Sequence, residues 1–122
     1  MWLLAAMNLG FMAWVLFDPE PVARFGGLSL ETAVAGSELR TMYGGLIGGL
    51  GLLNLIGAMR PRRLNAALWA TGWAFTGVGV VRLGCCIGLA LGGWQLAFAV
   101  SEVSAAVVCF WLLHKHESPH AD

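Results

Sequence analysis

Apolar residues along this chain fall into four long runs, separated by polar stretches of unequal length. The runs cover about residues 2–17, 38–59, 64–83 and 94–113. A helix of about 22 residues, the length of the second run, rises about 33 Å, which is enough to cross a hydrocarbon core of about 30 Å. The pattern predicts an all-α fold in which residues 1–122 form one integral membrane domain. We expect its four transmembrane helices to form an antiparallel up-down bundle.

The segments between the runs predict two kinds of connection. Residues 18–37 are polar and rich in proline and glycine, which argues against one continuous helix and favours an outer loop or a cap. This segment has room for a short helix around residues 30–35, and Ser37 is the expected N-cap of the second span. The Arg-Pro-Arg-Arg sequence at 60–63 is the tightest connection, because proline stops a helix and three arginines cannot remain in lipid.

The first run is short and could be mistaken for a signal peptide. It lacks a basic N-terminal region, and the Asp-Pro-Glu-Pro sequence after Phe17 is a poor cleavage site. We therefore expect an uncleaved first helix. Its shortness is also compatible with a start codon further upstream.

Composition and charge support a membrane protein. Hydrophobic residues make up 58% of the chain and charged residues 11%, and the mean hydropathy is +0.74. The formal net charge is zero, so no nucleic-acid-binding surface is expected. The adjacent pair Cys85 and Cys86 lacks the spacing of a redox or metal motif, and small apolar filling is the favoured interpretation.

The distribution of basic residues predicts the orientation. Four spans place the 60–63 loop and the tail at 114–122 on one side, and basic loops are retained in the cytoplasm. The basic residues near that side are Arg60, Arg62, Arg63 and Lys115, against Arg24, Arg40 and Arg82 on the other. We expect a protein of the bacterial inner membrane with both termini in the cytoplasm. Tail residues His114, His116 and His120 are more typical of a solvated tail than of a metal site, so we expect neither a metal nor a cofactor.

Charged residues within the apolar runs are the candidate chemistry. Glu38 and Arg40 point to nearly opposite sides of a helix that turns about 100° per residue, so they cannot neutralise each other. A lone carboxylate at Glu102, inside the fourth run, costs about 2.5–3.5 kcal/mol on insertion scales. Its expected partner is Arg82, because a turn at Gly92-Gly93 pairs positions about ten residues before and after it.

These charges predict one buried polar cluster in the outer half of the bundle. Its members would be Glu38, Arg40, Tyr43, Arg82 and Glu102. One interpretation is an ion-pair clasp that fixes the helix register. The other is a functional pocket for a lipid headgroup, a small molecule or a proton, because ionisable residues at membrane depth are functional candidates by default. The two interpretations are compatible.

Overlapping small-residue motifs follow the first charges. Gly44 and Gly48 form one pair, and Gly45 and Gly49 form another, each spaced to let a neighbouring backbone approach closely. A similar stripe on the fourth run consists of Ala97, Ser101 and Ala105. We expect these residues to serve helix packing, either within the chain or across a homodimer surface.

Several of these features together resemble a known family. The motif Glu-x-Arg-x-x-Tyr-Gly-Gly at residues 38–45, an arginine closing the third run and a glutamate within the fourth are similar to those of a family of small bacterial four-helix membrane proteins. That family carries only a "domain of unknown function" label. The resemblance covers nearly the whole chain and implies the four-span topology and the polar site, without an established activity.

The sequence leaves several functions open, in a clear order. The first is an inner-membrane protein that binds a lipid or amphipathic small molecule, or acts as an accessory subunit of a larger membrane complex. The second is a small proton-coupled exporter working as a dimer, although small multidrug exporters use a glutamate in the first span, where this chain has Asn8. An enzyme is third, because no metal-ligand set, nucleophile motif or phosphate loop is present in the sequence.

Overall fold

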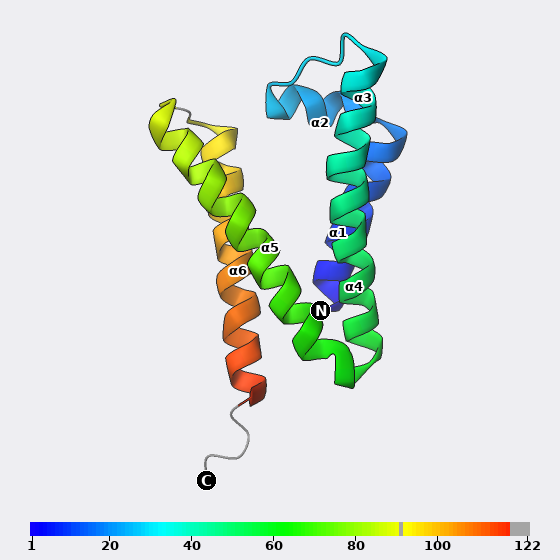
Figure 1. Cartoon of the computed structure of the whole chain (residues 1–122), viewed down its shortest axis with the longest axis vertical. Helices are drawn as coiled ribbons and strands as arrows, with labels where there is room; N and C mark the ends of the chain where they lie inside the picture. The colour runs from blue at the N-terminus through cyan, green and yellow to red at the C-terminus, as the bar shows by residue number, and fades with distance from the viewer. Residues whose placement is uncertain (91, 118–122) are drawn as a thin grey trace. The chain divides into compact units, whose positions relative to one another are not determined.

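The computed structural model describes residues 1–90 and 92–117, and over these ranges it is helical with no strand. The chain consists of two compact units, Met1–Arg60 and Pro61–Asp122. Each unit is built on long helices that run antiparallel to one another (Figure 1). The end of the predicted tail, with His120, lies outside the described residues.

In the first unit, helix α1 (Trp2–Phe17) packs antiparallel to a longer helical segment. This segment runs from Ala33 to Met59 and consists of α3 (Ala33–Leu39), a π-helical stretch η1 (Arg40–Leu46) and α4 (Ile47–Met59). The span expected at residues 38–59 thus begins further upstream. A π-helical stretch makes i→i+5 hydrogen bonds and is frequently found at functional sites. Here it begins at Arg40, in the middle of the expected charged motif.

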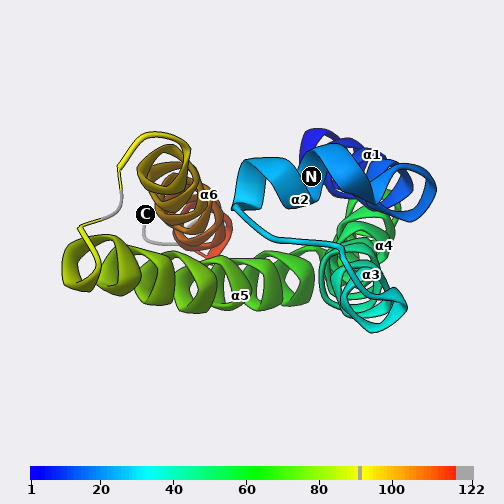
Figure 2. The ribbon, with the colours of Figure 1, turned by 90° about the horizontal axis from the view of Figure 1, so that it is seen from above.

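The polar segment after α1 contains a further helix, α2 (Pro19–Gly26). Prolines do not prevent it, because both lie in its first turn, where the backbone N–H has no intrahelical partner. Gly27 ends the helix with a φ of 69°, a left-handed conformation that glycine adopts readily. The axis of α2 is bent by 104° from that of α1 (Figures 1 and 2), so the chain turns sharply at Asp18.

The N-cap of the second long segment is Thr32, so the prediction that Ser37 fills this role is wrong. The Thr32 hydroxyl oxygen accepts from the backbone N–H of Ala35 at 3.1 Å, the geometry of an N-cap. Ser37 lies within α3, because the helix starts at Ala33 and continues through residue 37 without interruption. An extended backbone at Thr32 (φ −122°, ψ 150°) separates the helix from the preceding loop.

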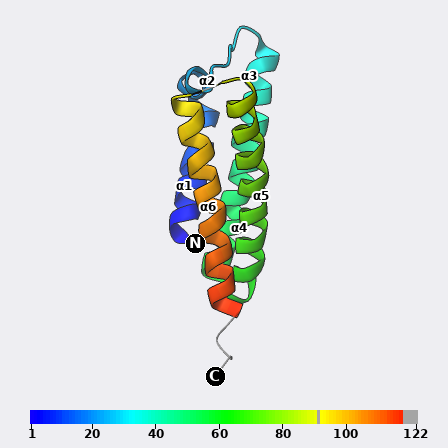
Figure 3. The ribbon, with the colours of Figure 1, turned by 90° about the vertical axis from the view of Figure 1, so that its left-hand side faces the viewer.

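The second unit is a hairpin of α5 (Pro61–Gly88) and α6 (Trp94–Glu117), which run side by side (Figure 3). Pro61 ends the preceding helix and also begins α5, since the residue before a proline favours the extended conformation found at Arg60. At the other end, positive φ values at Ala90 (52°) and Gly93 (61°) reverse the chain between α5 and α6.

Small residues bring α5 and α6 together, but not the ones expected. On α5 the close contacts are at Gly72, where an added β-carbon would lie 3.0 Å from the Phe110 ring, and at Gly79, 2.9 Å from Val103 Cγ2. On α6 the buried small residues are Ala99, Ala106 and Cys109. Of the expected stripe, Ala97 and Ser101 are exposed. The hairpin register turns the neighbouring face of α6 toward α5.

Three helical segments are long and apolar enough to cross a membrane: Ala33–Met59, Pro61–Gly88 and Trp94–His116. Helices α1 and α2 meet this criterion only as a bent pair, so the described residues offer three candidate spans, or four if the pair counts as one. Large apolar side chains such as Trp73, Val81 and Ile87 are more than half exposed. Apolar surface on this scale suits contact with lipid or with other proteins.

Candidate functional site

A carboxylate and a guanidinium join the two helices of the second unit. Arg82 Nε donates to both carboxylate oxygens of Glu102, at 2.9 and 3.1 Å, and Arg82 Nη2 donates to Oε1 at 2.9 Å. The forked geometry is the strong form of this interaction. The contact expected from the register of the hairpin is therefore present.

Two further side chains of α6 contact Arg82. Arg82 Nη1 donates to the Gln95 side-chain oxygen at 3.0 Å, and the guanidinium carbon lies 5.7 Å from the centre of the Phe98 ring. Sequence reasoning missed both. The available signal was spacing, because residues 95, 98 and 102 are three and four apart and share one helix face.

The position of the pair is fixed by the close approach at Gly79. An added β-carbon at this glycine would lie 3.3 Å from Glu102 Cβ, so only glycine lets α6 come this near. The side chains of Arg82 and Glu102 are 21% and 14% exposed. Two charges this far removed from water are costly to desolvate, and their forked hydrogen bonds offset that cost. The result is a net neutral polar network on a largely apolar hairpin.

In the first unit, Arg40 folds back toward the end of α1. Its Nε donates to the backbone carbonyl of Leu16 at 3.3 Å, and its Nη1 donates to that of Gly36 at 3.5 Å. Leu16 lies in the last turn of α1, where carbonyls lack intrahelical partners and a positive charge is favourable. Arg40 therefore caps α1 where the chain bends into α2. Within residues 1–60, all of which are described, it forms no ion pair.

The other two residues of the expected charged motif have different surroundings. Tyr43 is half-buried and packs against a small core of Val15, Ala23 and Leu39, where α1, α2 and α3 meet. Glu38 is exposed. Arg40, Tyr43 and Glu38 belong to the first unit and the Arg82–Glu102 pair to the second. The union of all five residues in one cluster stays a prediction.

The four glycines after this motif divide into two faces. Gly44 and Gly48 are buried against α1: an added β-carbon at Gly44 would lie 3.1 Å from Leu16 Cδ2, and one at Gly48 would overlap Met12. A third close contact, missed by the sequence analysis, is at Gly51 against Leu9. Gly45 and Gly49 are exposed, with nothing within 4 Å of the added atom. The two faces correspond to the two glycine pairs of the sequence analysis.

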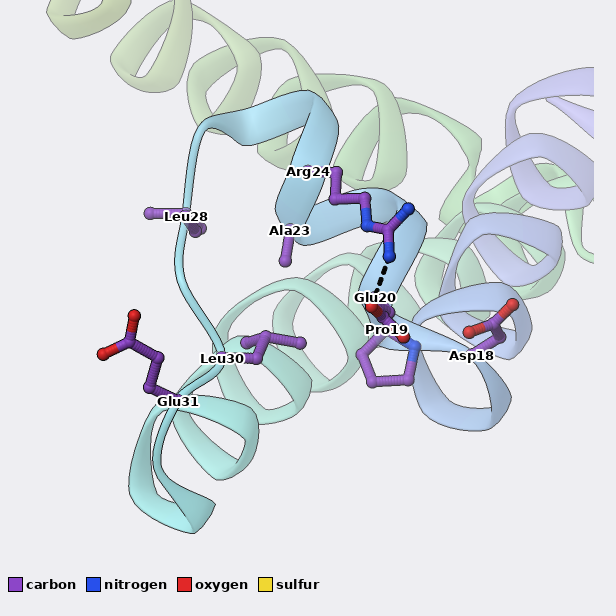
Figure 4. Close-up of a pocket in the computed structure, with 8 residues that line it drawn as sticks. All are labelled: Asp18, Pro19, Glu20, Ala23, Arg24, Leu28, Leu30 and Glu31. Atoms are coloured by element: carbon purple, nitrogen blue, oxygen red, sulfur yellow. Dashed lines mark hydrogen bonds and ion pairs between the residues drawn. The ribbon is translucent and has the colours of Figure 1, made fainter.

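A cavity beside α2 is lined in part by acidic residues (Figure 4). Arg24 is turned toward Glu20 and pairs with it at 2.6 Å, while the Asp18 and Glu31 side chains point away from that pair. These carboxylates do not converge on a point. Among the described residues there is no group of three histidine, cysteine or acidic side chains that could hold a metal ion. All three cysteines are free thiols, with Cys85 exposed.

Comparison with known proteins places the chain in a family. Residues 1–113 match a family model described as "Domain of unknown function (DUF4345)". The chain belongs to this family. The matched DUF4345 region covers the first unit and most of the second, including Arg40 and the Arg82–Glu102 pair. No curated protein and no solved structure matches the chain.

Proposed function

We propose that this protein is a four-span protein of the bacterial inner membrane that binds an amphipathic molecule through polar groups in the outer half of its bundle. The observation that carries the proposal is the network of Arg82, Glu102 and Gln95 on a hairpin long and apolar enough to cross a membrane. Charged groups at membrane depth are expensive and mark binding or transport sites more often than they serve structure alone.

Helix lengths support a shared depth for the charged residues. Arg40 precedes Arg60, and Arg82 follows Arg62, by about 20 residues each, or roughly 30 Å of helix. That rise matches a hydrocarbon core of about 30 Å. With the 60–63 loop at one membrane surface, both arginines then lie near the opposite one. There a headgroup can contact polar side chains while its hydrocarbon part contacts the apolar faces of the helices.

The geometry favours a binding role over proton-coupled export. The buried polar residue of α1 is Asn8, an amide that does not titrate and cannot replace the glutamate on which small multidrug exporters depend. Glu102 is held by Arg82 in a forked pair that joins α5 to α6, so its carboxylate is engaged within the hairpin. An accessory-subunit role is the second form of the proposal, in which exposed apolar faces of the helices contact partner subunits.

Native mass spectrometry of the protein, released from a mild detergent, tests the binding role. We expect protein ions that carry one retained amphipathic molecule and lose it under collisional activation. Ions of larger mass with additional polypeptides would favour the accessory role. Protein that stays bare after incubation with a total membrane lipid extract would overturn the binding role.

A further inference from the structure

A groove in the first unit is lined by residues that do not belong to the Arg82–Glu102 pair. Its volume is about 380 Å³, within the range of small-molecule sites, and it lies between α1 and the α3–η1 segment. Its polar lining consists of Ser37, Arg40 and Thr41. Its apolar lining includes Met12 and Leu16, with the backbone of Gly44 and Gly45 as part of the wall.

Arg40 gives the groove a positive charge that forms no ion pair within residues 1–60. Two of its five N–H donors point to backbone carbonyls, which carry no formal charge. The residue is exposed, so the remaining donors are accessible from the groove. A guanidinium fork with donors left over is the side chain best suited to a phosphate group.

Two hydroxyl groups accompany this charge. Ser37 and Thr41 both line the groove and are four residues apart, with Arg40 between them in the chain. Hydroxyls of this kind donate to phosphate oxygens that a guanidinium holds. The polar part of the groove therefore offers a guanidinium and two hydroxyl donors, without a carboxylate to repel an anion.

The apolar part of the groove continues toward the middle of the helix. Gly45 is exposed, and nothing lies within 4 Å of an added β-carbon there. This glycine therefore makes no close contact with α1 and leaves open space above its backbone. Beside it, Met12 and Leu16 supply hydrocarbon surface from α1. Because Arg40 lies at the edge of the proposed span, a group bound there has its polar end at headgroup level and its apolar end toward the bilayer centre.

We propose that this groove binds a phospholipid through its phosphate, with Arg40, Ser37 and Thr41 on the phosphate oxygens and the first part of an acyl chain over Gly45. A phospholipid and free phosphate present the same anionic group to Arg40. The apolar part of the groove should favour the phospholipid over free phosphate. This inference rests on the proposed function in one respect, since it needs the first unit to lie in a bilayer. It names the ligand class for Arg40 and leaves the site at Arg82 separate.

Native mass spectrometry with three added ligands tests the inference on the full chain in detergent. The ligands are phosphatidylglycerol, a diacylglycerol of the same chains without phosphate, and inorganic phosphate. Gly45→Leu fills the groove, and Gly49→Leu is its matched control, because both glycines are exposed and open but only Gly45 lines the groove. Arg40→Gln removes the positive charge of the groove, but it also removes the cap of α1. If Arg40→Gln does not fold for that reason, Gly45→Leu still tests the groove.

We expect wild type and Gly49→Leu to bind phosphatidylglycerol about tenfold more tightly than diacylglycerol, the size of one hydrogen bond to a charged group. Gly45→Leu and Arg40→Gln should both remove that preference. Equal binding of the two lipids, equal effects of the two leucine variants, or phosphate binding that Gly45→Leu leaves intact would each overturn the inference. If phosphatidylglycerol is lost only when Arg82 and Glu102 are both replaced by leucine, the proposed function survives and this groove is not its site. If no amphipathic molecule binds at all, the proposed function also fails.

Discussion

Arg82 and Glu102 lie 20 positions apart in the sequence and meet through three N–H···O contacts of 2.9–3.1 Å across the α5–α6 hairpin. Each charge offsets the desolvation cost of the other in an apolar environment. The pair also holds the two helices in one register. Such a pair is worth little as a net gain in stability but is costly to break. The same two residues can therefore clasp the hairpin and form part of a binding site.

Removal of one member of the pair should destabilise the protein strongly. Arg82→Leu or Glu102→Gln leaves a buried charge or polar group without its partner, at a cost of about 3–5 kcal/mol. The double change Arg82→Leu with Glu102→Leu should recover much of this loss. Thermal unfolding in detergent, followed by circular dichroism, measures all three variants.

The exposed pair of Arg24 and Glu20 is the matched control for this experiment. Its side chains are 77% and 64% exposed, so Arg24→Leu should change the free energy of unfolding by less than about 1 kcal/mol. Mild and additive effects of the Arg82 and Glu102 changes, no larger than that of Arg24→Leu, would show that the buried pair does not hold the hairpin.

Neighbouring glycines of α4 should respond in opposite ways to enlargement. Gly48→Leu forces a side chain into Met12 of α1 and should reduce the yield of folded, monodisperse protein in size-exclusion chromatography. Gly49→Leu points into open space and should fold as wild type does. If Gly49→Leu folds but loses a dimer present in wild type, that face is a homodimer surface; a folded Gly48→Leu variant would contradict the packing against α1.

The start of the second long segment should depend on Thr32. Thr32→Ala removes the oxygen that caps α3 and should lower stability by about 1 kcal/mol, within the range of 0.5–2 kcal/mol for N-cap changes. Ser37→Ala, inside the same helix, should have a smaller effect. Thermal unfolding of the two variants side by side checks this, and a larger loss for Ser37→Ala would contradict the position of the cap.

Topology in the membrane can be tested from both ends of the first unit. A periplasm-active reporter should be active when fused after Gly27 and inactive when fused after Lys115, because we expect the basic loop at 60–63 to be retained in the cytoplasm. In a variant without the native cysteines, Leu3→Cys should stay unlabelled by an impermeant maleimide in intact cells if α1 is a span. Labelling of that cysteine from outside would reduce the count to three spans.

The sequence predicted helix type and the long-range pair well, because both follow from simple periodicity. Runs of apolar residues predicted the helices, and counting outward from Gly92-Gly93 was sufficient to bring Arg82 to Glu102. Local chemistry was harder to predict. Thr32 and Ser37 are both good N-cap residues, and only the actual start of α3 separates them. The prolines in the 18–37 segment argue against one continuous helix, so the sequence did not predict α2. Both lie in the first turn of α2, where a missing backbone N–H removes no intrahelical hydrogen bond.

Packing details could not be predicted for a different reason. Of the glycines at 44, 45, 48 and 49, two contact α1 and two do not, and this depends on the rotation of the helix about its axis. The π-helical stretch at Arg40–Leu46 changes that rotation locally. The hydrophobic periodicity of the sequence does not predict this stretch. Gly72 and Gly79 lie seven residues apart, a heptad spacing that a search for pairs four apart does not find.

We propose that the polar network of Arg82, Glu102 and Gln95 binds an amphipathic molecule and does more than hold helices together. The most direct test is native mass spectrometry of the Arg82→Leu, Glu102→Leu double variant beside wild type, after thermal unfolding has shown that the variant is stable. We predict that wild type carries a retained amphipathic molecule that Gly45→Leu does not remove, and that the stable double variant loses most of it. A double variant as stable as wild type that still carries the same molecule in the same amount would show that Arg82 and Glu102 are a clasp only, and would contradict the claim.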